Sequence, residues 1–167
     1  MQNETETPNN LGQKLNFKRL TEAKAPGFKL LANGLYIAKV VNYEIRAKTP
    51  DKPVANWTLD VLPGDNVMFS DGEVVTTTQK LWHSYSLTPS DKYDPDSRLR
   101  ELVEAVDAAL LEKDELLLSE VYGKFAKVQV ITEPERHDKV TNRTYPARNA
   151  IKTFTPCTPE ELQALLG

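Results

Sequence analysis

A chain of 167 residues with 40% hydrophobic and 27% charged residues has the size and composition of one globular domain. The net charge of −3 excludes a uniformly basic surface, and the single cysteine, Cys157, excludes an internal disulfide and fits a reducing compartment. No apolar window of about 18 residues could span a membrane, and residues 1–10 lack a signal-peptide core. We therefore expect a cytoplasmic protein.

The first half of the chain predicts a flexible segment followed by strands. Residues 1–25 are rich in Asn, Gln, Glu and Lys and have few apolar anchors, so we expect them to be flexible. The expected domain covers 26–156. Stretches rich in β-branched and aromatic residues, several of them alternating apolar with polar, predict strands. They lie at 35–47, 56–62, 73–82, 124–132 and 148–154.

The middle of the chain changes to a helical period. Asp94 and Pro95 form an N-cap and first-turn pair. An apolar stripe with helical spacing follows at Leu99, Leu102, Val103, Val106 and Leu110. Residues 115–121 predict a short second helix or a turn, and 133–146 a polar hairpin-like excursion. Thr158 and Glu161 form a capping box, which predicts a short C-terminal helix within 157–167.

The order of these elements predicts a mainly β fold with helices. Three strands, a helix and two further strands are the order of the OB-fold, a five-stranded Greek-key barrel. The expected architecture is an OB-like barrel with a helix between strands three and four and a short helix at the C-terminus. A small α+β sandwich has the same order of elements, and spacing alone does not separate the two.

Catalytic and metal-binding patterns are not found. The chain contains no P-loop, no Gly-x-Gly-x-x-Gly, no Gly-x-Ser-x-Gly and no His-Glu-x-x-His. Its two histidines, His83 and His137, lie far apart, and a zinc site would need both together with Cys157. The acidic residues at 91, 94 and 96 are explained by the start of a helix. We therefore expect neither an enzyme nor a cofactor.

Strand faces that combine aromatic and basic side chains indicate binding. Single-stranded nucleic acids are held by aromatic stacking and by cations on the phosphates. Lys80 and Trp82 share one strand face, and Phe125 and Lys127 share another. Residues 121–154 hold seven Lys and Arg against three Asp and Glu. The candidate nucleic-acid-binding residues are Lys39, Trp57, Lys80, Trp82, Phe125, Lys127, Arg143, Tyr145, Arg148 and Lys152.

Each candidate also has a purely structural interpretation. The aromatic residues could belong to the core, and Trp57 is the one that best fits that role. The lysines could form an ordinary solvated strand face. The sequence leaves both interpretations open.

Several short motifs, in order, resemble a known family. They are the stretch that begins Gly34-Leu-Tyr-Ile-Ala-Lys-Val, the Leu-x-x-Leu-Val pattern of the predicted helix, Tyr122-Gly123-Lys124 before a strand, and 148–156, Arg-Asn-Ala-Ile-Lys-Thr-Phe-Thr-Pro. Across 30–156 the chain resembles OB-fold single-stranded-DNA-binding proteins of bacteriophage replication and recombination. The resemblance implies sequence-tolerant DNA binding in the host cytoplasm, without cofactor or catalysis. Such proteins often end in an acidic tail, whereas this chain ends in Glu160-Glu161 and a Leu-rich helix, which puts recruitment of partners through a tail in doubt.

Other functions remain open from the sequence. A protein-interaction module, such as a phage accessory or structural protein, would dock replication or recombination partners through its terminal segments. A homo-oligomer could form through Leu162, Leu165 and Leu166 of the C-terminal helix. A nuclease is the third alternative, and it would require divalent metal.

Overall fold

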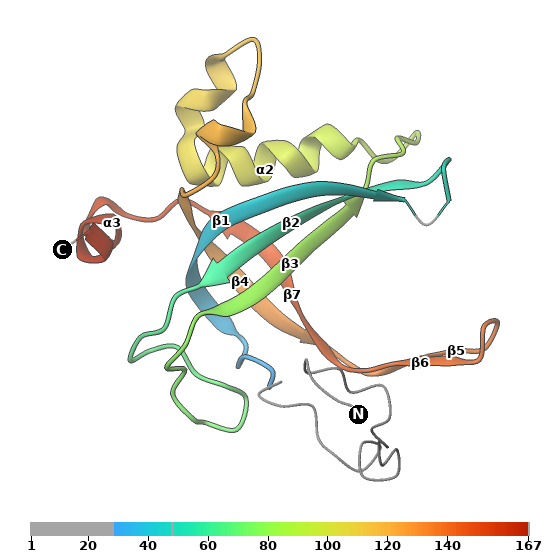
Figure 1. The fold of residues 1–167 in the computed structure, drawn as a ribbon, viewed down its shortest axis with the longest axis horizontal. Coiled ribbons are helices and arrows are strands. Elements are labelled where there is room, and N and C mark those ends of the chain that lie inside the picture. The colour runs from blue at the N-terminus through green and yellow to red at the C-terminus, as the bar shows by residue number, and fades with distance from the viewer. Residues whose placement is uncertain (1–28, 48, 167) are drawn as a thin grey trace, which may run out of the picture.

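The computed structural model describes residues 29–47 and 49–166 and has a mainly β fold with two α-helices (Figure 1). One antiparallel sheet contains β1 (Gly34–Ala47), β2 (Pro53–Val61), β3 (Gln79–Ser86), β4 (Phe125–Glu133) and β7 (Arg148–Thr155). Its strand order is β3-β2-β1-β4-β7. A separate hairpin pairs β5 (Arg136–Asp138) with β6 (Arg143–Tyr145), as the polar excursion predicted. The predicted flexible segment 1–25 lies outside the described residues.

Alternation along the strands produces the core. Successive side chains of a strand point to opposite faces of the sheet, so every second residue is buried. On β4, Ala126, Val128 and Val130 are fully buried, while Phe125 and Lys127 on the other face are half-buried. The equivalent buried residues of β1 and β2 are Tyr36, Ala38, Val40, Ala55, Trp57, Leu59 and Val61.

The third strand begins later than its sequence predicted. The β-branched residues 73–78 do not belong to a long strand, and β3 runs from Gln79 to Ser86. Instead, residues 67–75 fold back on themselves: the Val75 amide donates to the Val67 carbonyl and the Phe69 amide to the Glu73 carbonyl. Val75 is buried and belongs to the hydrophobic core. Residues with high β-propensity therefore pair within a local loop here and do not join the main sheet.

Helix α2 (Pro95–Asp107) lies across one end of the sheet (Figure 1). Asp94 caps it by accepting from the Asp96 amide at 2.9 Å, as predicted. Of the predicted stripe, Leu102, Val103 and Leu110 are buried in the core, and Leu99 and Val106 pack against it; Leu110 lies beyond the end of α2. Two 3-10 helices follow, η1 (Ala108–Glu112) and η2 (Leu118–Glu120).

The C-terminal helix is also confirmed. Helix α3 (Pro159–Leu166) begins with the predicted capping box. The Thr158 amide donates to the Glu161 carboxylate at 2.8 Å, and the Glu161 amide donates to the Thr158 hydroxyl at 3.1 Å.

The sheet does not close into the predicted barrel. In the described part of the chain, no ladder joins the edge strands β3 and β7, although both line one cleft. The curved five-stranded sheet therefore keeps an opening between its two edges, and the candidate site lies there.

Candidate nucleic-acid interface

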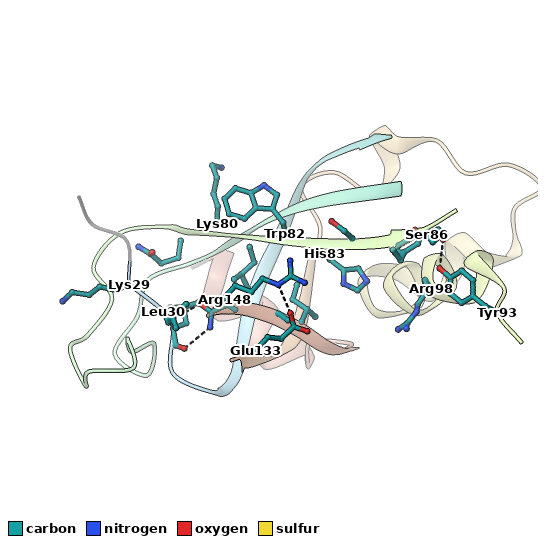
Figure 2. Close-up of a pocket in the computed structure, with 18 residues that line it drawn as sticks. Lys29, Leu30, Lys80, Trp82, His83, Ser86, Tyr93, Arg98, Glu133 and Arg148 are labelled. Carbon is teal, nitrogen blue, oxygen red and sulfur yellow. Dashed lines mark hydrogen bonds and ion pairs between the residues drawn. The ribbon is translucent and has the colours of Figure 1, made fainter. Parts of the chain in front are cut away.

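A cleft of about 780 Å³ runs along β3 and faces β7 (Figure 2). Its lining includes all eight residues of β3, 148–151 of β7, and 29–31 before β1. Tyr93 and Arg98, around the start of α2, complete one end. Strand β3, along which the cleft runs, is about 25 Å long at roughly 3.3 Å per residue. The cleft is therefore long enough for an extended polymer segment of several monomer units.

Trp82 and Lys80 stand side by side on the outer face of β3 (Figure 2). They share this face because Leu81 and His83 turn inward between and beyond them. The Trp82 side chain is 53% exposed, although most large apolar side chains of the sheet are buried. An exposed indole beside an ammonium group is the pairing that base stacking and phosphate contact require.

Four cationic side chains and one carboxylate line the cleft: Lys29, Lys80, Arg98, Arg148 and Glu133. Arg148 Nε lies 2.7 Å from Glu133 Oε1, and Lys29 contacts Asp71 and Glu73. These pairs are exposed and therefore weak, about 0–1 kcal/mol each. A polyanion can replace such carboxylates. Arg98 has no ion-pair partner among the residues of the two described segments.

His83 lies on the inner side of the cleft wall. Its ring packs edge-on against Phe154, with ring centroids 4.9 Å apart, and the residue is only 9% exposed. Burial, followed by the charge of Arg98, lowers its pKa from 6.5 to about 4. Nε2 has no hydrogen-bond partner in the described structure. His83 is thus a neutral structural residue at physiological pH, unsuited to hold a phosphate.

A row of side chains crosses the outer face of the sheet next to the cleft. Lys80 pairs in register with Asp60, Asp60 with Lys39, and Lys39 with Phe125. The structure thus brings three predicted residues from three separate strands into one line. Phe125 is half-buried but is not part of the core cluster. This row and the cleft meet at Lys80.

Lys127 is held by the C-terminal helix. Its Nζ lies 3.0 Å from Glu161 Oε1 of α3, and its side chain is only 25% exposed. The predicted phosphate contact of Lys127 would therefore have to displace this partly covered ion pair. Lys152 is exposed on β7, where the β4–β7 register shifts, and it does not line the cleft.

Arg143 and Tyr145 belong to the β5–β6 hairpin and not to the cleft. The Arg136 guanidinium lies over the Tyr145 ring, 4.7 Å from its centroid. One face of Tyr145 is therefore occupied. Arg143 is exposed.

Trp57 is a core residue, and its inclusion among the binding residues needs correction. It is 1% exposed, and its Nε1 donates to the Tyr85 hydroxyl at 3.2 Å. Its ring also packs on Tyr43 with centroids 4.5 Å apart. Because its side chain points to the buried face of β2, this indole cannot reach a base.

Three residues that line the cleft were not among the candidates predicted from the sequence. Lys29, Tyr93 and Arg98 come from segments far from β3 and β7, and only the folded chain brings them together. Arg98 lies in the first turn of the predicted helix, next to Leu99 of the apolar stripe, and the helical pattern did not single it out.

Metal-ligand clusters and membrane-spanning helices were also sought in the described residues. Within 29–47 and 49–166, no three His, Cys, Asp or Glu side chains gather where a metal ion could bind. Across the same two segments, no helix combines the length and apolar character needed to cross a membrane. No protein-family model matches the chain, and no curated protein is significantly similar to it.

Proposed function

We propose that this protein binds single-stranded DNA without sequence preference, in the cleft between β3 and β7 and on the adjoining outer face. The observation that carries the proposal is Trp82, which is 53% exposed at the edge of a cleft with four cationic side chains. An exposed indole in such surroundings has no evident role in stability. Its π-face accepts any base, so binding would tolerate all sequences.

The strand order supports the same proposal. In the order β3-β2-β1-β4-β7, β1 pairs with both β2 and β4, and a helix separates β3 from β4. An OB-fold has this arrangement, and it binds oligonucleotides on the face of strands two and three, flanked by two loops. On this comparison, the exposed face with Lys80, Trp82 and the Asp60–Lys39 row would correspond to that binding face. We infer an open OB-like sheet, serving replication or recombination of a bacteriophage in the host cytoplasm.

Fluorescence anisotropy with labelled oligo-dT tests the proposal. We expect the wild type to bind at low salt, with tryptophan quenching, and to weaken as salt rises because phosphate contacts release counterions. Trp82→Ala should lose about tenfold or more in affinity, since each stacked base contributes roughly 1–3 kcal/mol. Trp82→Phe is the matched control and should retain most of the binding. No binding of the wild type even at low salt would end the proposal, and an RNA oligomer of equal length would show any preference for DNA.

Docking of a protein partner is the second candidate function. It is favoured by exposed leucines in two places: Leu117 and Leu118 are 59% and 38% exposed, and Leu162 of α3 is 37% exposed. Deletion of 156–167 discriminates the two functions. Loss of partner binding with intact oligo-dT binding would support docking through α3.

A further inference from the structure

The β5–β6 hairpin stands apart from the rest of the fold. It projects beyond the ends of β4 and β7, away from α2 (Figure 1). An isolated two-stranded hairpin is at best marginally stable in water. An element of this kind therefore calls for a role outside the core.

Local contacts fix the shape of the hairpin. The Asp138 carboxylate accepts from the Val140 amide at 2.9 Å, a contact that lowers the pKa of Asp138. Asn142 adopts the left-handed conformation at φ 57°, which closes the turn. His137 Nδ1 lies 3.0 Å from the Thr144 hydroxyl, and Arg136 covers Tyr145. The tip is thus presented in one defined form.

The tip carries an unusual side chain for a solvated turn. Val140 is 94% exposed, more than any other large hydrophobic side chain in the described residues. Arg136, Lys139 and Arg143 surround it along the hairpin and are all exposed. None of these three cations forms an ion pair with another residue of 29–47 or 49–166. Their charge therefore remains available to a polyanion.

The hairpin begins where the cleft ends. Glu133 and Arg148 form an ion pair at its base, and both line the cleft (Figure 2). A strand of DNA that leaves the cleft past Arg148 would meet the hairpin next. Tyr145 is covered on one face, and the hairpin carries no other aromatic ring except His137. It is therefore poorly suited to stack further single-stranded bases.

From this geometry we propose that the hairpin binds duplex DNA at a single-strand–duplex junction. Arg136, Lys139 and Arg143 contact the phosphates of the duplex, and Val140 packs against the terminal base pair. Cationic side chains beside an apolar wedge are the combination by which proteins contact and unstack duplex steps. This inference rests on the proposed binding of the single strand in the cleft.

Anisotropy with three DNAs tests the inference: a dT oligomer, the same dT oligomer joined to a short duplex, and that duplex with blunt ends. We expect the wild type to bind the joined DNA about tenfold tighter than the dT oligomer, since each exposed charge contact adds up to a few-fold. The variant Lys139→Ser/Val140→Ser/Arg143→Ser should bind the joined DNA and the dT oligomer equally. Its affinity for the dT oligomer should stay within twofold of the wild-type value. Arg100→Ser, on the exposed side of α2, is the control and should keep the preference.

Three outcomes would overturn the inference. Equal wild-type affinity for the dT oligomer and the joined DNA would exclude a junction preference. A parallel loss of both affinities in the triple variant would assign the hairpin to the single-strand path. A change in sedimentation of the triple variant without DNA would assign it to contact between copies of the chain. In each case oligo-dT binding by the wild type would leave the proposed function intact, whereas its absence would remove both.

Discussion

Lys80 and Asp60 face each other across the β2–β3 ladder, with Lys80 Nζ 3.0 Å from Asp60 Oδ1. The Lys80 side chain is 56% exposed, whereas that of Asp60 is 18% exposed. The ammonium group therefore keeps access to solvent and to a ligand, and the carboxylate holds it beside Trp82. Asp60 both positions the cation and competes with phosphate for it.

Asp60→Asn is therefore expected to strengthen DNA binding. The substitution removes a negative charge from the interface and leaves Lys80 without a competing partner. We expect oligo-dT affinity to rise about threefold, and the dependence on salt to steepen by up to roughly 0.7 in the log–log slope for one added phosphate contact. Titrations at several salt concentrations measure both. A fall in affinity would mean that Asp60 mainly orients Lys80.

Two tryptophans in neighbouring strands provide a paired test of stability. Trp57 is 1% exposed and Trp82 is 53% exposed. Trp57→Ala should lower the free energy of unfolding by about 3–5 kcal/mol, because it leaves a large cavity and an unpaired Tyr85 hydroxyl. Trp82→Ala should change it by less than about 0.5 kcal/mol, as surface substitutions usually do. Urea unfolding compares them, and a large loss of stability in Trp82→Ala would make Trp82 a structural residue.

These two residues also show how far sequence alone reaches. The alternation of β2 and β3 placed Trp57 and Trp82 on strands and put Lys80 and Trp82 on one shared face, and the structure shows that this shared face is the exposed one. Alternation does not state which face of a strand is inside, so Trp57 remained among the binding candidates. That distinction depends on the neighbouring strands, because burial of Trp57 requires Tyr43 and Tyr85 from β1 and β3.

The fold was predictable where the pattern is periodic and not where loops compete. The apolar stripe of α2 and both helix caps are confirmed. The predicted start of β3 was wrong because residues 73–75 pair locally with 67–69 instead of joining the sheet. The opening between β3 and β7 depends on curvature of the whole sheet, which no local pattern encodes. The cleft, which needs that opening, could not be foreseen.

His83 makes stability depend on acid. Its pKa is lowered to about 4 in the folded chain by burial and by the charge of Arg98, against about 6.5 when unfolded. Between these pH values the unfolded state binds the proton more readily than the folded state. The free energy of unfolding therefore has its full value above pH 6.5 and decreases as the pH falls toward 4. The loss amounts to about 3 kcal/mol for a shift of this size.

His83→Phe should remove this part of the pH dependence. A phenyl ring keeps the aromatic contact with Phe154 and eliminates the buried nitrogen that has no partner. We expect the variant to gain stability over the wild type as pH falls from 6.5 to 4, measured by urea unfolding at each pH. His137→Phe, on the exposed hairpin, is the matched control. Equal pH profiles for wild type and His83→Phe would contradict burial of a neutral imidazole.

Lys127 should contribute to the docking of α3 more than to DNA binding. Its Nζ is paired with Glu161 at 3.0 Å and it lies outside the cleft. Lys127→Met keeps the aliphatic stem and removes the pair, so we expect oligo-dT affinity to change by less than about twofold, within the range of one exposed ion pair. Amide exchange in α3 should become faster, because the helix loses a tether to β4. Lys80→Met is the comparison, with the opposite pattern expected: weaker DNA binding and unchanged exchange in α3. If Lys127→Met weakened DNA binding as much as Lys80→Met, the path of the DNA would have to extend over β4, and α3 would have to move to admit it.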